Sequence, residues 1–290
     1  MNILVWTDND LDGAGAALAI KWLYSEKGKV FRINEVTEST ILGKFKGALG
    51  TLDHYDKIFI LDLDLKPDVI KVIDRPNVVV IDHHIQHVSH KNLYKNAKPI
   101  LEQFSSCAEL IYKKFNTVLT LTDEQRTLIK HINDYDCYNT KNPEGFKLNA
   151  IHQGLNNPKA EKFIDSFFDG FREYTILEKN SIKLYFKKLK EQLQNAQLFK
   201  GKIKDYNIIA TFANYAISEV AHFLIKRHNA DIGIVVNPTS KTVSFRRSKE
   251  STVDVSVLAK TLCNGGGTPA ASGGALTENF ANLTKNFLPC

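Results

Sequence analysis

The chain opens with the stretch that decides its fold, residues 2–17, NILVWTDNDLDGAGAA. The apolar run 3–6 predicts a buried strand, and Gly13 and Gly15 predict a tight turn before a helix over residues 14–24. Between strand and turn, carboxylates occupy alternate positions: Asp8, Asp10 and Asp12. Acidic groups crowded at the end of a strand repel one another, and ligands of α/β sheets bind at that end. A divalent metal ion is the simplest partner for them.

Two other structures share an acidic motif of this kind. An EF-hand calcium loop requires a bidentate Glu at its twelfth position, where this chain has Ala19, and it follows a helix rather than a strand. A solvated acidic turn that caps the next helix is the plain structural alternative. One capping Asp is enough for that purpose, so a cap does not account for three. We therefore expect a cation site.

Composition sets broad limits on the protein. The 290 residues are 43% hydrophobic, which is enough for two domains with real cores and argues against disorder. A net charge of +6 fits a polyanionic partner without identifying one. We expect neither a signal peptide nor a membrane-spanning segment, and a cytoplasmic location. Four widely spaced cysteines predict ordinary thiols of a reducing compartment rather than a zinc site: Cys107, Cys137, Cys263 and Cys290.

Two later segments repeat the opening pattern of an apolar strand with a polar end. They are residues 57–64, KIFILDLD, and residues 77–84, NVVVIDHH. Helical segments alternate with the strands, which predicts an α/β fold with a parallel, doubly wound sheet. The polar ends would then converge on one edge of that sheet. The groups that follow these two strands are Asp62, Asp64, Asp82, His83 and His84.

The rest of the chain predicts a second, smaller α/β region. Ser105 and Ser106 are candidate N-caps of a helix, and a serine pair at a helix start can also hold a phosphate. Residues 159–198 are expected to be helical, and 276–287 to form the last helix. The expected organisation is a sheet domain over 1–170, a helical linker over 171–204 and the smaller domain over 205–290.

The polar residues near the strand ends, with two from a later helix end, form a set of hard ligands. Oxygen donors with one or two imidazoles suit manganese or magnesium better than zinc. The set is larger than one ion needs, which predicts two ions that share a bridging Asp, an arrangement that stabilises phosphoryl displacement. The set is Asp8, Asp10, Asp12, Asp62, Asp64, Asp82, His83, His84, Asp134 and Asp136.

A glycine run near the C-terminus has the composition of a phosphate cradle. Glycines let backbone N–H groups approach an anion, and arginine provides bidentate contact, here from Arg246 and Arg247. A flexible turn between helix and strand is the alternative. The run comprises Gly265, Gly266 and Gly267.

Taken together, these motifs resemble the DHH phosphoesterase superfamily. The resemblance rests on Asp8-x-Asp10-x-Asp12-Gly, the strand ending in Asp62, Asp82-His83-His84, Tyr135-Asp136 and the glycine-rich ending at residues 265–273. That ending resembles the DHHA1 substrate-binding subdomain of RecJ-type exonucleases and nanoRNase/oligoribonuclease proteins. The resemblance implies two Mn²⁺ ions, with Mg²⁺ as the other option, a metal-activated hydroxide and a phosphodiester substrate.

The resemblance also implies roles for individual residues. Asp82, His83 and His84 match the catalytic signature, in which His83 also binds metal. Asp136 fits the fourth motif better than Asp134 because it directly follows a tyrosine. The implied metal ligands are Asp8, Asp10, Asp12, Asp62, His83 and Asp136. The implied contacts to substrate phosphate are Arg246, Gly265, Gly266, Gly267 and Thr268.

The chain departs from the family pattern at two positions. Trp6 occupies a position at which many relatives have a metal-binding histidine, and Asp8 is the candidate replacement. Thr268 stands where relatives have a histidine after the third glycine, and its hydroxyl can bind a phosphate but brings no positive charge. These departures bear on metal affinity and on substrate preference respectively.

The expected function is a manganese-dependent phosphodiesterase acting on short RNA or DNA oligonucleotides or linear dinucleotides. The length leaves no room for an added single-strand-binding OB-fold, which a processive exonuclease would exploit. A RecJ-like exonuclease on single-stranded DNA and a degenerate, non-cleaving nucleic-acid binder are the alternatives. An aspartyl phosphatase pattern fails at Lys66, and the glycine-rich ending favours nucleotides over pyrophosphate. The oligomeric state, with a homodimer among the options, stays open.

Overall fold

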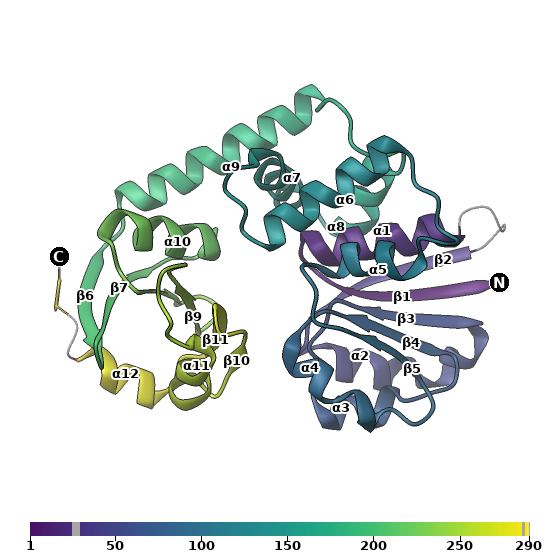
Figure 1. The fold of residues 1–290 in the computed structure, drawn as a ribbon, viewed down its shortest axis with the longest axis horizontal. Helices are drawn as coiled ribbons and strands as arrows, with labels where there is room; N and C mark the ends of the chain where they lie inside the picture. The colour runs from purple at the N-terminus through teal and green to yellow at the C-terminus, as the bar shows by residue number, and fades with distance from the viewer. Residues whose placement is uncertain (25–29, 286–287, 290) are drawn as a thin grey trace. The chain divides into compact units, whose positions relative to one another are not determined.

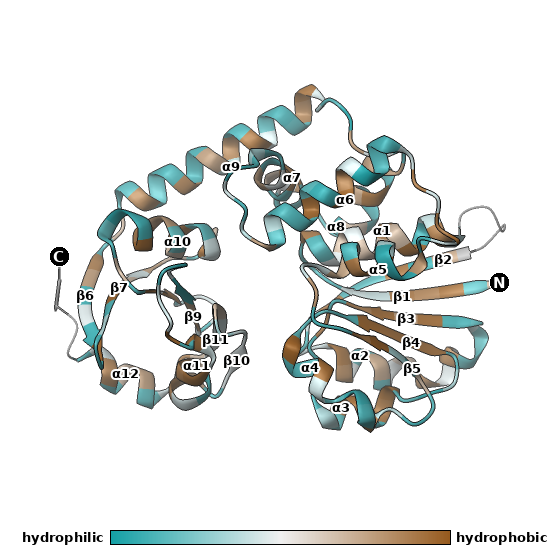
Figure 2. Ribbon diagram, in the orientation of Figure 1, coloured by the Kyte–Doolittle hydropathy of each residue, from teal (hydrophilic) through white to brown (hydrophobic). Residues whose placement is uncertain are grey.

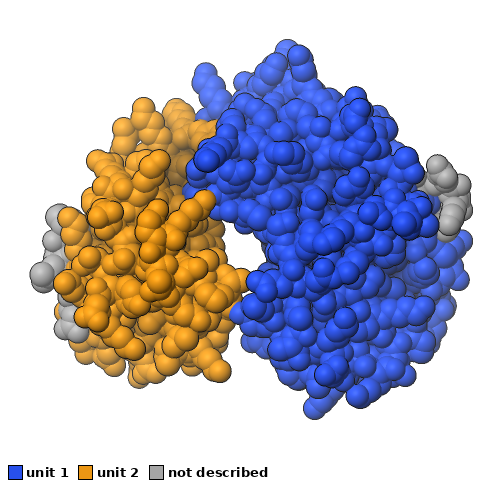
Figure 3. All heavy atoms as spheres, viewed as in Figure 1, with its two compact units in different colours: residues 1–183 blue, residues 184–290 orange. Residues whose placement is uncertain are grey.

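The computed structural model describes residues 1–24, 30–285 and 288–289 (Figure 1). The chain divides into two compact units, Met1–Lys183 and Leu184–Cys290, which Figure 3 shows in different colours. The division falls inside one helix, α9 (Ile176–Gln194). The domain limits expected at residues 170 and 204 stay a prediction. Cys290 lies outside the described residues.

The first unit is built on a five-stranded sheet in the order β2-β1-β3-β4-β5. Every pair of neighbours is parallel, so the predicted parallel, doubly wound sheet is confirmed. The central strands are apolar and buried, as parallel strands covered on both faces must be, and Figure 2 shows them in the hydrophobic colour. The strands are β1 (Asn2–Asp8), β2 (Val30–Val36), β3 (Lys57–Leu61), β4 (Val78–Asp82) and β5 (Lys98–Leu101).

Helices cover both faces of this sheet and create two separate cores (Figure 1). Alternate residues of β1 supply them: Ile3 and Val5 pack into one core, and Leu4 and Trp6 into the other. The first core lies under α1 (Leu11–Tyr24), α5 (Cys107–Phe115), α6 (Asp123–Asp136), α7 (Pro143–Gly154) and α8 (Lys159–Phe167). The second core lies under α2 (Ile41–Ala48), η2 (Leu49–His54) and α3 (Pro67–Ile73). Two short helices, α4 (Ile85–Ser89) and η3 (Lys91–Leu93), lie between β4 and β5 in the sequence.

The two glycines after the acidic motif lie inside a helix, so the predicted turn is wrong. α1 begins at Leu11, and a Cβ at Gly13 would overlap the carbonyl oxygen of Asp8. A Cβ at Gly15 would lie 2.8 Å from Cδ1 of Ile132. Both glycines therefore allow α1 to pack closely, the first against the end of β1 and the second against α6.

The predicted helix over residues 159–198 is interrupted. α8 ends at Phe167, and Gly170 then takes a φ of +105°, where a Cβ would lie 2.5 Å from the backbone nitrogen of Gln125. Only glycine fits such a backbone and such a close approach. α9 starts at Ile176 and ends at Gln194, before a strand that the sequence analysis missed, β6 (Leu198–Ile203).

The second unit has a seven-stranded mixed sheet in the order β10-β11-β9-β8-β7-β6-β12. Only β7 and β8 pair in parallel among its described strands. The remaining strands are β7 (Tyr206–Phe212), β8 (Ile232–Asn237), β9 (Thr242–Arg247), β10 (Gly266–Gly267), β11 (Ala271–Ala275) and β12 (Leu288–Pro289). The helices are α10 (Ile217–His228), α11 (Val255–Cys263) and α12 (Glu278–Thr284), so the last helix is shorter than predicted and Phe287 lies outside the described residues. None of the described helices is both long and apolar enough to cross a membrane.

One histidine in α7 is buried without a hydrogen-bond partner among the described residues. His152 is fully buried, and among the described residues neither of its ring nitrogens has a hydrogen-bond partner. Burial lowers the pKa of His152 to about 3, so the ring is neutral in the folded protein. An unsatisfied polar group costs about 1–3 kcal/mol relative to an apolar group of the same shape.

We therefore expect His152→Leu to raise the free energy of unfolding by about 1 kcal/mol. The unfolded histidine binds a proton near pH 6.5 but the folded one does not, so wild-type stability falls as the pH drops below 6.5. The advantage of the variant should grow from pH 7 to pH 5 in urea melts. The exposed His54→Leu is the control and should change stability little. A destabilised His152→Leu would mean that the ring has a partner after all.

Candidate metal centre

The polar ends of β1, β3 and β4 meet around the imidazole of His83. Its Nε2 atom lies 3.3 Å from Oδ1 of Asp62, 3.8 Å from Oδ2 of Asp12 and 3.8 Å from Oδ2 of Asp136. These residues come from four separate places in the sequence. The edge on which the strand ends were expected to converge therefore carries a cluster of one imidazole and three carboxylates.

His83 is oriented by its other ring nitrogen. Nδ1 lies 3.2 Å from the backbone carbonyl oxygen of Phe104, which can only accept a hydrogen bond, so Nδ1 carries the hydrogen. Nε2 is then the ring atom that faces the carboxylates. Metal-binding histidines are typically fixed in this way by a carbonyl or carboxylate behind the ring.

Asp62 combines backbone strain with an unsatisfied oxygen. Its φ is +58°, an uncommon conformation for a residue other than glycine, and its N–H donates to the carbonyl of Ile81 at 3.0 Å. The residue is 3% exposed, yet no hydrogen bond satisfies Oδ1 within the described part of the chain. Strain of this kind is retained mainly at functional sites, and a buried carboxylate oxygen without a donor fits a cation.

Asp12 is held by the start of α5. Its Oδ2 accepts the N–H of Cys107 at 2.6 Å, and its Oδ1 accepts the N–H of Ala108 at 3.0 Å. Ser106 caps the same helix by accepting the N–H of Glu109 at 3.2 Å, as the sequence predicted. The Asp12 carboxylate thus has a fixed orientation, with its Oδ2 edge toward His83.

The two acids at the end of α6 have different partners. Asp134 pairs with Nζ of Lys130 at 2.7 Å and accepts hydrogen bonds from Asn139 and Asn142. Asp136 instead approaches His83. The structure therefore brings Asp136, rather than Asp134, to the cluster.

Asp8 and Asp10 belong to neither of the two sets of donor atoms that lie closest together. Oδ1 of Asp10 accepts the N–H of Gly13 at 2.8 Å, and Oδ1 of Asp8 accepts the N–H of Asn9 at 2.8 Å. Burial and the charge of Asp10 raise the pKa of Asp8 to about 8. Among the described residues, two sets of donors have ligand atoms that lie within 4.8 Å of one another. The first set is Asp62, Asp82, His83 and His84, and the second is Asp12, His83 and Asp136.

Asp82 aligns two histidines. The carboxylate is fully buried and accepts Nδ1–H of His84 at 2.7 Å and Nδ1–H of His87 at 2.8 Å. Although burial opposes ionisation, these hydrogen bonds hold the pKa of Asp82 below its ordinary value. Nε2 of His87 in turn lies 2.7 Å from the hydroxyl of Tyr94. Neither His87 nor Tyr94 was predicted from the sequence, in which the only signal was the proximity of His87 to His83 and His84.

A bound cation would offset the charges of the acids in the cluster. Burial and neighbouring carboxylates raise the pKa of Asp62, and burial and Asp10 raise that of Asp12. Although burial opposes it, Asp62 and Asp12 raise the pKa of His83 to about 11. Hard oxygen donors with an imidazole nitrogen suit Mn²⁺ or Mg²⁺. The donor set, the orphaned oxygen of Asp62 and the fixed ring of His83 all fit such an ion.

A comparison with protein families agrees with this geometry. Residues 2–137 match the family model described as "DHH family, N-terminal domain". This part of the chain belongs to the DHH family. Among curated proteins, none matches the sequence significantly.

Solved structures share the fold of this chain. RecJ in complex with Mn²⁺ from Thermus thermophilus has a TM-score of 0.60 and 11% identity, over 98% of this chain and 51% of that chain. An exopolyphosphatase-related protein from Bacteroides fragilis has a TM-score of 0.58 and 15% identity, over 98% and 91%. An exonuclease RecJ bound to manganese has a TM-score of 0.53 and 12% identity, over 98% and 88%. At these identities, the likeness concerns the fold.

The candidate metal centre takes no ligand from position 6. Trp6 is 3% exposed and packs in the second core, where its ring meets that of Phe45 edge-on at 4.9 Å. The tryptophan therefore serves packing. Asp8 is the nearest acid on the same strand, and its role as a replacement ligand stays a prediction.

The predicted phosphate-binding residues belong to the second unit. Arg246, on β9, donates to the carbonyl of Phe245 at 2.9 Å and to Oγ of Ser218 at 2.7 Å. The hydroxyl and N–H of Thr268 close the β10–β11 turn on the carbonyl of Ala271. Their contact with phosphate stays a prediction.

Packing explains two of the three glycines in this run. A Cβ at Gly265 would overlap the carbonyl oxygen of Gly273, and Gly267 has a φ of +132°. A Cβ at Gly266 would meet no atom within 4 Å. Gly266 is therefore the member of the run whose small size the fold does not demand.

We expect Mn²⁺ to stabilise the wild-type protein, by about 2.7 kcal/mol at a hundredfold excess over its Kd. Asp62→Asn should lose most of that gain because the neutral amide binds the ion weakly. The same variant should be as stable as the wild type, or more stable, in EDTA, because one repelling charge is gone. Thermal melts with and without Mn²⁺ measure both effects.

The matched control is Asp134→Asn, an acid two positions from Asp136 that is paired elsewhere. It should keep the full shift with Mn²⁺. An equal shift in Asp62→Asn and wild type would show that the ion binds away from His83.

Proposed function

We propose that the chain is a metal-dependent phosphodiesterase that hydrolyses short oligonucleotides or linear dinucleotides. The observation that carries the proposal is the cluster of Asp12, Asp62 and Asp136 around Nε2 of His83. Divalent ions bound by such donors lower the pKa of water and neutralise charge that develops on phosphoryl oxygens. Manganese, with magnesium as the other option, fits the donors. RecJ structures in complex with Mn²⁺ and with Mg²⁺ support the same pair.

Each side chain has a distinct proposed role. Asp12, Asp62, His83 and Asp136 would hold one ion, and Asp62 would bridge to a second ion shared with Asp8 and Asp10. The orphaned Oδ1 of Asp62 supports bridging, because the fold supplies it with no hydrogen bond among the described residues. Fixed orientation matters, since metal-assisted displacement depends on ligands held in place before reaction.

Asp82 and His84 would act on the substrate rather than on the ion. Because Nδ1–H of His84 is bound by Asp82, its Nε2 is the atom available to a phosphoryl oxygen or a leaving oxygen. The buried Asp82 favours a positively charged His84, whose pKa the carboxylate raises to about 10 against the effect of burial. A charged imidazole can stabilise the phosphoryl group and donate a proton.

The substrate class is supported by the second unit. Its Arg246 carries a guanidinium, which is a phosphate-binding group, and pairs in register with Ala271 of the glycine-rich hairpin. The net charge of +6 suits a polyanion. An exonuclease on single-stranded DNA is the second candidate, favoured by the fold shared with RecJ. A non-cleaving binder is the third, motivated by Trp6 and Thr268.

A Mn²⁺ assay over a ladder of RNA and DNA oligomers from two to thirty nucleotides separates these candidates. We expect kcat/KM to be highest on the shortest oligomers. A preference for long DNA would favour the exonuclease, and no cleavage with retained binding would favour the binder. A polyphosphate substrate belongs in the same assay, because one structural neighbour is named for it.

Variants then tie the activity to the cluster. His83→Ala and Asp62→Asn should reduce kcat by at least about a thousandfold, the scale of losing a principal electrostatic group. Asp134→Asn should remain within a fewfold of wild type. Equal activity in His83→Ala and the wild-type protein would refute the proposed site.

A further inference from the structure

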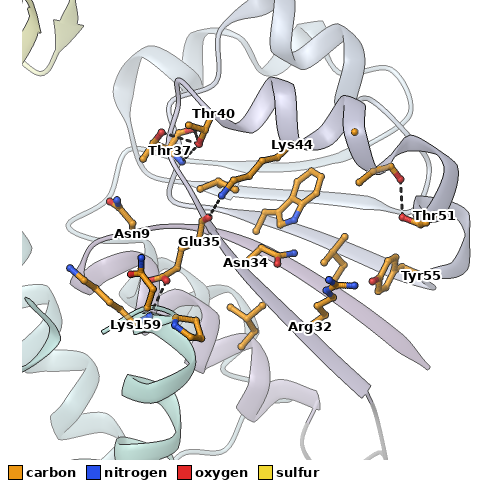
Figure 4. A pocket seen from close by; sticks show the side chains of 18 residues that line it. Asn9, Arg32, Asn34, Glu35, Thr37, Thr40, Lys44, Thr51, Tyr55 and Lys159 are labelled. Atoms are coloured by element: carbon orange, nitrogen blue, oxygen red, sulfur yellow. Dashed lines mark hydrogen bonds between the residues drawn. The ribbon is translucent and has the colours of Figure 1, made fainter. Parts of the chain in front are cut away.

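A separate cavity lies beside β2, the edge strand of the first sheet. It has a volume of about 1090 Å³ and is lined by residues of β1, β2, the α2–η2 segment and the start of α8 (Figure 4). None of the residues gathered around His83 lines it. The proposed function makes no use of this cavity, which we call the β2 groove.

The floor of the β2 groove is apolar with polar groups beside it. Leu4 and Trp6 line it from β1, and they pair in register with Arg32 and Asn34 of β2. Residues paired across parallel strands point to the same face of a sheet, so these four side chains share one surface. An aromatic and aliphatic floor with a guanidinium and an amide at its edge is a mixed surface of the kind that binds small polar aromatic molecules.

The helix that forms the wall leaves the groove open. Gly47, near the end of α2, lines the cavity, and a Cβ there would meet no atom within 4 Å. Glycine in a helix costs about 1 kcal/mol relative to alanine. No packing contact in the described structure demands glycine at position 47. Its small size preserves the space between α2 and β2.

The polar groups of the groove are available to a ligand. Arg32 is exposed, and within the described residues neither it nor Asn34 makes a side-chain hydrogen bond or ion pair. Glu35 is the only acid among the described residues that line the groove, and its carboxylate accepts the N–H of Lys159 at 2.9 Å and of Ala160 at 3.0 Å. The negative charge of Glu35 is therefore bound by backbone N–H groups at the start of α8. Because no other acid lines the groove among the described residues, the groove is suited to an anion.

We infer that the β2 groove binds a nucleotide, with its base on the apolar floor and its phosphate at Arg32. Arginine presents a planar fork of donors that matches phosphate oxygens. The amide of Asn34 has both a donor and an acceptor for the edge of a base. Tyr55, which lies near Arg32 at one end of the view in Figure 4, offers aromatic surface for a base.

The groove also reaches the acidic motif of the metal centre. Asn9 lines its other end and stands between Asp8 and Asp10 in the sequence. The nucleotide has two sources: a free nucleoside monophosphate, or one nucleotide of a longer strand. The inference concerns binding and holds whether or not the chain hydrolyses phosphodiesters.

Isothermal titration calorimetry in EDTA tests it, because a strand then stays intact. The probes are adenosine monophosphate and a five-nucleotide oligoadenylate, titrated into the full chain. We expect saturable binding that Gly47→Phe abolishes by filling the groove and that Arg32→Ala weakens about tenfold or more. Asp62→Asn should bind as the wild type does, which separates this site from the metal centre.

Matched controls are available on α2. Gly43→Phe changes another unobstructed helix glycine that does not line the groove, and Lys46→Ala removes an exposed cation that does not line it either. Both should retain the wild-type Kd. Circular dichroism and thermal melts establish that Gly47→Phe is folded. Should it fail to fold, the comparison of Arg32→Ala with Lys46→Ala decides.

The results support or overturn the inference as follows. Equal Kd values for the two probes, lost in Gly47→Phe, identify a free nucleotide as ligand. Tenfold tighter binding of the oligonucleotide with the same dependence identifies a strand. Undiminished binding in folded Gly47→Phe, or in Arg32→Ala, overturns the site, as does inorganic phosphate that binds as well as the nucleotide.

Discussion

Burying several carboxylates around one imidazole is the constraint on which the rest of the first unit depends. Asp12, Asp62 and Asp136 all approach Nε2 of His83, and like charges at such separations are costly in a protein interior. The fold opposes this cost with directed hydrogen bonds: two backbone N–H groups of α5 on Asp12 and a carbonyl behind His83. The close packing of α1, made possible by its glycines, sets the distance between these elements.

The sequence predicted the local part of this arrangement well. Apolar strands ending in acids were visible as strings of letters, and a parallel sheet necessarily brings such ends to one edge. The choice of Asp136 over Asp134 followed from the adjacent tyrosine. The use of Asp12 to cap α5 could not be predicted, because its partners are 95 and 96 residues away. His87 and Tyr94 were missed for a related reason: His87 is bound to the buried Asp82, and Tyr94 is bound to His87 rather than to the carboxylate.

Two errors in the fold prediction had a common cause, which is that glycine was judged by local propensity. Gly13 and Gly15 suggested a turn, yet tertiary packing places them inside α1. Gly170 was taken as part of a helix, yet its φ of +105° ends one. The burial of Trp6 was predicted from the apolar run 3–6, and its contact with Phe45 agrees with that prediction.

The left-handed backbone at Asp62 has a consequence for how this lineage can change. With a φ of +58°, the position readily accepts Gly, Asn or Asp and excludes branched residues. An Asp-to-Asn change there needs one nucleotide, keeps the turn and removes the charge. A descendant that abandons the proposed catalysis can therefore do so at position 62 with little loss of fold. Neutral drift toward asparagine at this codon would be an early mark of a relative that has become a binding protein.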